Sequence, residues 1–180
     1  LYSPDDGRSM GLQGMIDDLV GQCDYPRRSL PVDPALFDRA LAKDPQAIAA
    51  LITTCETLPD ARGQVVETMK ARQADRVIPV LGITGTGGAG KSSLVDELVR
   101  RFVQDQQDKH VAILSIDPSK RRTGGALLGD RIRMNSVDHP RVYMRSLATR
   151  QANLAMSAHV ADAIEICKAA GYDLVIVETS

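Results

Sequence analysis

Hydrophobic and polar positions divide the chain into two parts with different periodicities. From about residue 77 onward, short apolar runs alternate with segments in which apolar residues recur every three or four positions. The short runs predict strands and the longer period predicts amphipathic helices. Strands are expected over residues 80–84, 111–116, 142–145 and 173–178, and helices over 91–106, 126–135 and 152–170. This alternation predicts an α/β fold with a parallel sheet flanked by helices on both faces.

The first 75 residues show helix signals and no strand pattern. Residues 1–32 combine turn signals with one short helical patch that has an apolar face. Pro26, Pro31 and Pro34 mark the linker that follows this patch. Asp33-Pro34 and Asp44-Pro45 each place an N-cap residue before a proline at the first helical position. We therefore expect residues 33–75 to form an α-helical linker in front of a domain that starts at residue 76, with residues 1–32 set apart from both.

Composition excludes several classes of protein. The 180 residues carry a net charge of -1 and contain no Trp, which argues against a basic or base-stacking surface for nucleic acid. No apolar run has the length of a membrane span. The three cysteines and three histidines form no metal-ligand or disulfide pattern, so a reducing, cytoplasmic setting is the expectation.

The strongest chemical signal lies between the first predicted strand and the helix after it. Residues 85–92, Gly-Thr-Gly-Gly-Ala-Gly-Lys-Ser, match the phosphate-loop pattern G-x-x-x-x-G-K-[ST] at every fixed position. Lys91 is expected to reach the β- and γ-phosphates and act in catalysis, and the Ser92 hydroxyl to bind Mg²⁺. The residues predicted to bind the nucleotide are Gly85, Gly87, Gly88, Ala89, Gly90, Lys91, Ser92 and Ser93. A glycine-rich turn that binds nothing is the alternative.

Carboxylates follow two of the predicted strands. Asp117 comes directly after the strand that ends at residue 116, and Glu178 ends the last predicted strand. Ligands of parallel α/β sheets bind at the carboxyl ends of strands, and Mg²⁺ prefers oxygen ligands. Asp117, Glu178 and Ser92 are therefore predicted to organise Mg²⁺, with Asp130 as a further candidate. The alternative is that each carboxylate only caps a turn or a helix.

A basic segment connects these carboxylates. Arg133 lies three residues after Asp130 and could contact phosphate or pair with that aspartate. Residues 118–135 are interpreted either as a solvated basic loop or as a mobile loop that closes on the γ-phosphate.

Four stretches together resemble the G-protein chaperones of adenosylcobalamin-dependent acyl-CoA mutases. They are residues 80–93, 115–119, 122–134 and 171–179. The resemblance implies a P-loop GTPase fold over about residues 77–180, a preference for GTP, and a GTPase cycle that gates cofactor loading. It also implies that Ser92, Asp117, Asp130 and Glu178 serve the Mg²⁺ site and that Arg133 lies by the nucleotide.

The first sixteen residues resemble the exit from a cobalamin-binding domain in fused isobutyryl-CoA mutases, in which one polypeptide also carries the mutase barrel. Residues 147–155 replace a glycine-rich stretch of the stand-alone chaperones, which favours the fused form. We therefore expect a segment of a longer, homodimeric protein whose G domain works with cobalamin-binding and mutase domains. A stand-alone chaperone GTPase, a small-molecule P-loop kinase and an interaction module without turnover are the alternatives.

Overall fold

The computed structural model describes residues 3–23, 32–72, 76–118, 134–149 and 158–179. The chain divides into two compact units, Leu1–Pro31 and Val32–Ser180. None of the helices within these described ranges combines the length and apolar character that crossing a membrane requires. The predicted helix over 126–135 and the start of the one over 152–170 fall largely outside the described residues.

The described residues of the first unit form the helix α1 (Pro4–Cys23), with a break at Gly11. Gly11 has φ 65° and ψ 173°, a left-handed conformation that favours glycine. Ser3 caps the helix, because its hydroxyl accepts from the Asp6 amide while the Ser3 amide donates to the Asp6 carboxylate at 2.7 Å. Several apolar side chains of α1 are exposed: Met10, Leu12, Ile16, Leu19 and Val20.

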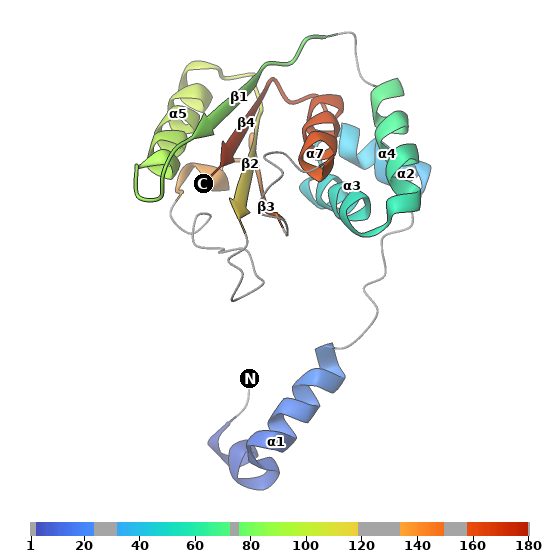
Figure 1. Cartoon of the computed structure of the whole chain (residues 1–180), viewed down its shortest axis with the longest axis vertical. Coiled ribbons are helices and arrows are strands. Elements are labelled where there is room, and N and C mark those ends of the chain that lie inside the picture. Colours follow the sequence, from blue (N-terminus) through green and yellow to red (C-terminus); the bar gives the residue numbers. More distant parts are fainter. Residues whose placement is uncertain (1–2, 24–31, 73–75, 119–133, 150–157, 180) are drawn as a thin grey trace. The chain divides into compact units, whose positions relative to one another are not determined.

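The second unit is built on a sheet of four parallel strands in the order β1-β4-β2-β3 (Figure 1). The strands are β1 (Val80–Thr84), β2 (Val111–Pro118), β3 (Val142–Thr149) and β4 (Leu174–Thr179). The predicted α/β class with a parallel sheet is confirmed. Strands β2 and β3 run further than predicted because they pair in register through Asp117–Ala148 and Pro118–Thr149.

Different helices cover the two faces of the sheet (Figure 1). Val111 and Ile113 of β2 share a hydrophobic cluster with Val95 and Val99 of α5 (Lys91–Asp105), which also packs against the short 3-10 helix η1 (Ser136–Asp138). The alternate residues of β2 face a second cluster, formed with α7 (Ala158–Ala169) and with the three helices between residues 34 and 71. Because strand side chains alternate between faces, one strand supplies both cores.

Three helices before the sheet form an outer layer on α7: α2 (Pro34–Leu41), α3 (Pro45–Thr57) and α4 (Pro59–Ala71). The two predicted N-caps are confirmed, since the carboxylates of Asp33 and Asp44 accept from the amides of Leu36 and Gln46 at 2.8 and 2.9 Å. Helix α4 begins at Pro59, because the first turn of a helix tolerates a residue without an amide donor. The N-terminal helices therefore share a core with the sheet.

Strand β1 is more exposed than the sequence predicts. The apolar run from residue 77 predicts a buried strand, yet Val77 is 95% exposed and both Val80 and Leu81 are 42% exposed. The cause is position, since β1 lies at the edge of the described sheet and pairs only with β4. The prediction of a strand over residues 80–84 is confirmed, and the prediction that the apolar run from residue 77 is buried is wrong for the described residues.

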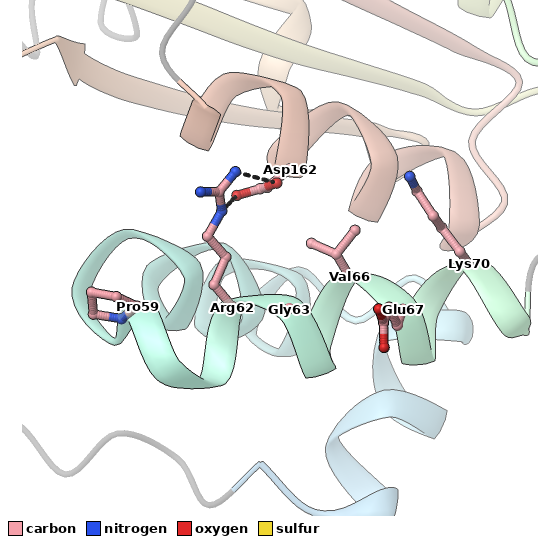
Figure 2. Close-up of a pocket in the computed structure, with 7 residues that line it drawn as sticks. All are labelled: Pro59, Arg62, Gly63, Val66, Glu67, Lys70 and Asp162. Atoms are coloured by element: carbon pink, nitrogen blue, oxygen red, sulfur yellow. Dashed lines mark hydrogen bonds and ion pairs between the residues drawn. The ribbon is translucent and has the colours of Figure 1, made fainter.

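An ion pair fixes α4 to α7 (Figure 2). Both carboxylate oxygens of Asp162 accept from the Arg62 guanidinium, at 2.5 Å from Nε and 3.2 Å from Nη2. The Asp162 side chain is only 9% exposed, whereas that of Arg62 is 38% exposed.

Burial, with Asp162 nearby, also raises the pKa of the Cys55 thiol on α3 to about 11. A hollow of about 450 Å³ beside the pair is lined by Pro59, Arg62, Gly63, Val66, Glu67, Lys70 and Asp162.

Replacing Arg62 is expected to destabilise the fold strongly. Arg62→Met leaves the buried Asp162 carboxylate without the guanidinium that compensates its charge. The expected loss in the free energy of unfolding is about 3 kcal/mol, at the lower end of what breaking a buried ion pair costs, because Arg62 is partly exposed. Urea unfolding measures the change. Arg101→Met is the matched control, since Arg101 is 68% exposed beside Glu97 and should change stability by less than about 1 kcal/mol. Equal effects of the two substitutions would contradict the assigned role of Asp162.

Candidate nucleotide-binding site

The phosphate loop connects β1 to α5, as the motif predicts. Gly88 and Gly90 have φ values of 81° and 82°, which are left-handed and would strain any residue with a side chain. Gly90 is also the N-cap of α5, and its carbonyl accepts from the Leu94 amide at 2.9 Å. Residues 85–90 are all exposed. The backbone amides at this helix start therefore remain accessible to an anion.

Lys91 lies across the loop that it terminates. Its Nζ donates to the Thr86 carbonyl at 3.0 Å. A Cβ atom added to Gly85 would lie 3.4 Å from Lys91 Cδ, in ordinary van der Waals contact, so the lysine stem lies directly over this glycine. The acceptor of this bond is neutral, so an arriving phosphate, which carries a full negative charge, can compete with the carbonyl for the ammonium.

Ser92 and Glu178 meet beneath the loop. The Ser92 hydroxyl donates to Oε1 of Glu178 at 2.7 Å, across 86 positions of sequence. Glu178 is only 3% exposed, and its second oxygen, Oε2, is buried without a hydrogen-bond partner among the described residues. A buried carboxylate oxygen without a partner is costly, which makes this position a candidate for binding a cation or its water.

Asp117 lies at the same carboxyl end of the parallel strands as Glu178. Glu178 of β4 lies in register between Ile83 of β1 and Ser115 of β2, so Asp117 comes two residues further along β2. Its backbone belongs to β2, but its side chain is outside the described part of the structure. The arrangement of backbones therefore agrees with the strand-end prediction, and the predicted contact of Asp117 with Mg²⁺ stays a prediction.

The other predicted site residues divide between described and undescribed segments. Asp130 and Arg133 belong to the segment 119–133, and residues 150–155 belong to the segment 150–157. Both segments are outside the described residues. Ser93 is exposed on the first turn of α5. The described residues contain no group of three or more His, Cys, Asp or Glu side chains placed to hold a metal.

The available donor atoms fit Mg²⁺. Ser92 Oγ and the unpartnered Glu178 oxygen are both hard oxygen donors, and Mg²⁺ is usually held by one or two protein groups together with substrate phosphates and waters. When bound, Mg²⁺ neutralises charge on the β- and γ-phosphates.

Asp96 makes a contact that the sequence did not predict. This residue lies on α5 and its Oδ1 accepts from both the amide and the hydroxyl of Ser136, at 2.8 and 2.6 Å. Burial alone would raise the pKa of Asp96, but the hydrogen bonds from Ser136 outweigh it and lower that pKa. The available signal was its spacing, four residues after Ser92 on the same predicted helix.

The fold and this site define a P-loop nucleotide-binding protein. A LAO/AO transport system kinase of known structure matches with a TM-score of 0.60 and 22% sequence identity, over 82% of this chain and 44% of that chain. At this identity the match shows the fold alone.

Sequence comparison identifies the family. The profile described as methylmalonyl-CoA mutase-associated GTPase MeaB matches residues 48–180. The chain belongs to this GTPase family, which confirms the predicted resemblance.

Long bacterial relatives match the whole chain. A fused isobutyryl-CoA mutase of Geobacillus kaustophilus is 54% identical over 100% of this chain and 17% of the relative. One from Cupriavidus metallidurans is 53% identical over 100% of this chain and 16% of the relative. The chain thus spans about a sixth of the length of these curated relatives, and the match includes its first 32 residues.

Proposed function

We propose that this chain is the linker and GTPase segment of a fused, adenosylcobalamin-dependent acyl-CoA mutase. In this proposal it binds GTP with Mg²⁺, hydrolyses it, and gates the loading of adenosylcobalamin into a mutase that interconverts isobutyryl-CoA and n-butyryl-CoA. The observation that carries the nucleotide part is the Ser92–Glu178 pair with its unpartnered carboxylate oxygen beneath the phosphate loop. The mutase part is supported by similarity to fused relatives along the whole chain.

Each group of residues at the proposed site has its own role in binding GTP and Mg²⁺. Amides of residues 85–90 and the start of α5 hold the phosphates. Lys91 exchanges its bond to the Thr86 carbonyl for the β- and γ-phosphates and stabilises the charge that develops during transfer. Ser92 and Glu178, with Asp117 and Asp130, orient the Mg²⁺ shell, while Arg133 adds a further cation by the nucleotide.

The partners follow from the same proposal. They are a guanine nucleotide and the cobalamin-binding and mutase domains of the same polypeptide, in a cytoplasmic homodimer, with residues 1–32 leading out of the cobalamin-binding domain. Nucleic acid and membranes are not among the partners that we propose.

Calorimetric titration of the full-length protein with GTP and with ATP, each with Mg²⁺, tests the choice of nucleotide. The proposal predicts GTP binding at least about 100-fold tighter than ATP binding, because hydrogen bonds to the correct base are lost with the wrong one. Mutase activity is then the next assay. Equal or tighter ATP binding would overturn the guanine assignment and favour a small-molecule kinase.

A further inference from the structure

Ser115 is a buried polar residue on the sheet face that α5 covers. The preceding β2 residues on this face, Val111 and Ile113, are fully buried in the hydrophobic cluster formed with α5, and Ser115 is only 4% exposed. Because strand side chains alternate between faces, Ser115 continues the row of these two residues. A buried hydroxyl is costly unless it forms hydrogen bonds, whereas an apolar side chain at the same place carries no such cost. The position of Ser115 therefore indicates a polar neighbour.

That neighbour is Glu178. The two residues are in-register partners on the adjacent parallel strands β2 and β4. Ile176, two residues before Glu178, belongs to the cluster that α5 covers, so Glu178 lies on this face as well. Neighbouring strands are about 4.8 Å apart. The side chains of Ser115 and Glu178 therefore start one strand spacing apart on the same face.

One oxygen of the Glu178 carboxylate is in use and the other is available. Ser92, in the first turn of α5, donates to Oε1 at 2.7 Å. Oε2 is buried and has no hydrogen-bond partner among the described residues, the Ser115 hydroxyl included. Two oxygen atoms that share one water lie about 4.5–5.5 Å apart, close to one strand spacing. Ser115 and Glu178 are therefore placed to share a water on the side of the carboxylate that faces away from Ser92.

We propose that Ser115 is a positioning residue of the Mg²⁺ site, which holds the Glu178 carboxylate and the water shared with it in the orientation that the metal shell needs. The inference rests on the proposed nucleotide function and deepens it. Ser115 contacts neither phosphate nor metal in this proposal. It acts through Oε2, as outer-shell partners of metal ligands do when they orient a carboxylate.

Ser146 provides a matched control in the same row of the sheet. It is the in-register partner of Ser115 on β3 and lies on the same face. Two strand spacings, about 10 Å, separate it from Glu178, which is too far for one shared water. Ser146→Ala therefore removes an equivalent hydroxyl without affecting the proposed contact.

The test is the Mg²⁺ concentration needed for half-maximal GTP binding by the full-length protein, measured by calorimetry. Ser115→Ala is expected to raise this concentration about tenfold, the lower end of the loss caused by removing an outer-shell partner. Ser115→Thr keeps a hydroxyl and should stay within about threefold of the wild type, as should Ser146→Ala. An unchanged Mg²⁺ requirement in Ser115→Ala would overturn the proposal, as would equal effects of the Ser115→Ala and Ser146→Ala substitutions.

A double variant shows whether Ser115 acts through Glu178. In Ser115→Ala/Glu178→Gln the Mg²⁺ requirement should stay within about threefold of that of Glu178→Gln alone, because the carboxylate that Ser115 orients is already absent. Independent effects would multiply to about 100-fold relative to the wild type and would overturn the proposal.

Thermal unfolding without nucleotide and Mg²⁺ separates positioning from stability. A lower melting temperature of Ser115→Ala with an unchanged Mg²⁺ requirement would show a purely structural role and overturn the proposal. If Ser115→Ala does not fold, Ser115→Cys decides, since it nearly keeps the volume of the side chain and leaves only a weak hydrogen-bonding group. It should raise the Mg²⁺ requirement in the same direction.

The two proposals fail in different ways. An effect of Glu178→Gln without an effect of Ser115→Ala would overturn only the role of Ser115 and leave the proposed Mg²⁺ site intact. Tighter binding of ATP than of GTP by the wild-type protein would overturn the guanine assignment. The same Mg²⁺ titration with ATP would then still decide the role of Ser115.

Discussion

Lys91→Ala is expected to abolish GTP binding at micromolar protein concentrations while leaving the fold intact. The ammonium is the proposed charged partner of the β- and γ-phosphates, and truncating one member of such a pair costs about 3 kcal/mol or more, which is about 100-fold or more in Kd. The fold should survive, because Lys91 Nζ donates to the Thr86 carbonyl on an exposed loop and not to a group in the core.

Calorimetry with GTP and Mg²⁺ measures this loss, and circular dichroism verifies that the variant is folded. Lys70→Ala is the matched control, because Lys70 is a half-exposed lysine on α4 that lies 3.7 Å from Glu165 and belongs to another part of the fold. It should bind GTP like the wild type. An unchanged GTP affinity in Lys91→Ala would remove the basis for assigning a phosphate loop.

Glu178→Gln is expected to separate function from stability. The substitution keeps the shape of the side chain but removes its charge, so the Mg²⁺ concentration needed for half-maximal GTP binding should rise about tenfold or more and hydrolysis should fall at least as far. Without nucleotide the variant should be as stable as the wild type or more stable, because burying a neutral amide costs less than burying a carboxylate that has an oxygen without a partner.

Mg²⁺ titrations of GTP binding, together with thermal unfolding of the nucleotide-free protein, provide both readouts. Glu97→Gln is the control, since that carboxylate is exposed on α5 and held by Arg100 and Arg101. A purely structural role for Glu178 would show as a lower melting temperature with an unchanged Mg²⁺ requirement.

Local signals in the sequence predicted much of the fold. The caps at Asp33 and Asp44, each followed by a proline, and the glycine loop before Lys91 depend on residues a few positions apart, and all three are confirmed. The Ser92–Glu178 contact was also predictable, because carboxyl ends of parallel strands share one edge with the phosphate loop.

Contacts between distant segments were not predictable in the same way. The Arg62–Asp162 pair spans 100 positions, and nothing in either local sequence indicates that α4 packs on α7. The Asp96–Ser136 contact likewise joins residues 40 positions apart in the sequence. The exposure of β1 depends on strand order, which apolar runs do not encode.

The open edge of β1 has a practical consequence for the solubility of this segment. Val80 and Leu81 are half-exposed on a strand whose outer hydrogen-bonding groups face no strand in the described sheet, and Leu94 of α5 is also exposed. An unprotected apolar edge is a template for pairing with another chain, so aggregation of the isolated segment is expected to begin there. A charged residue such as lysine in place of Leu81 would act as a gatekeeper against such pairing.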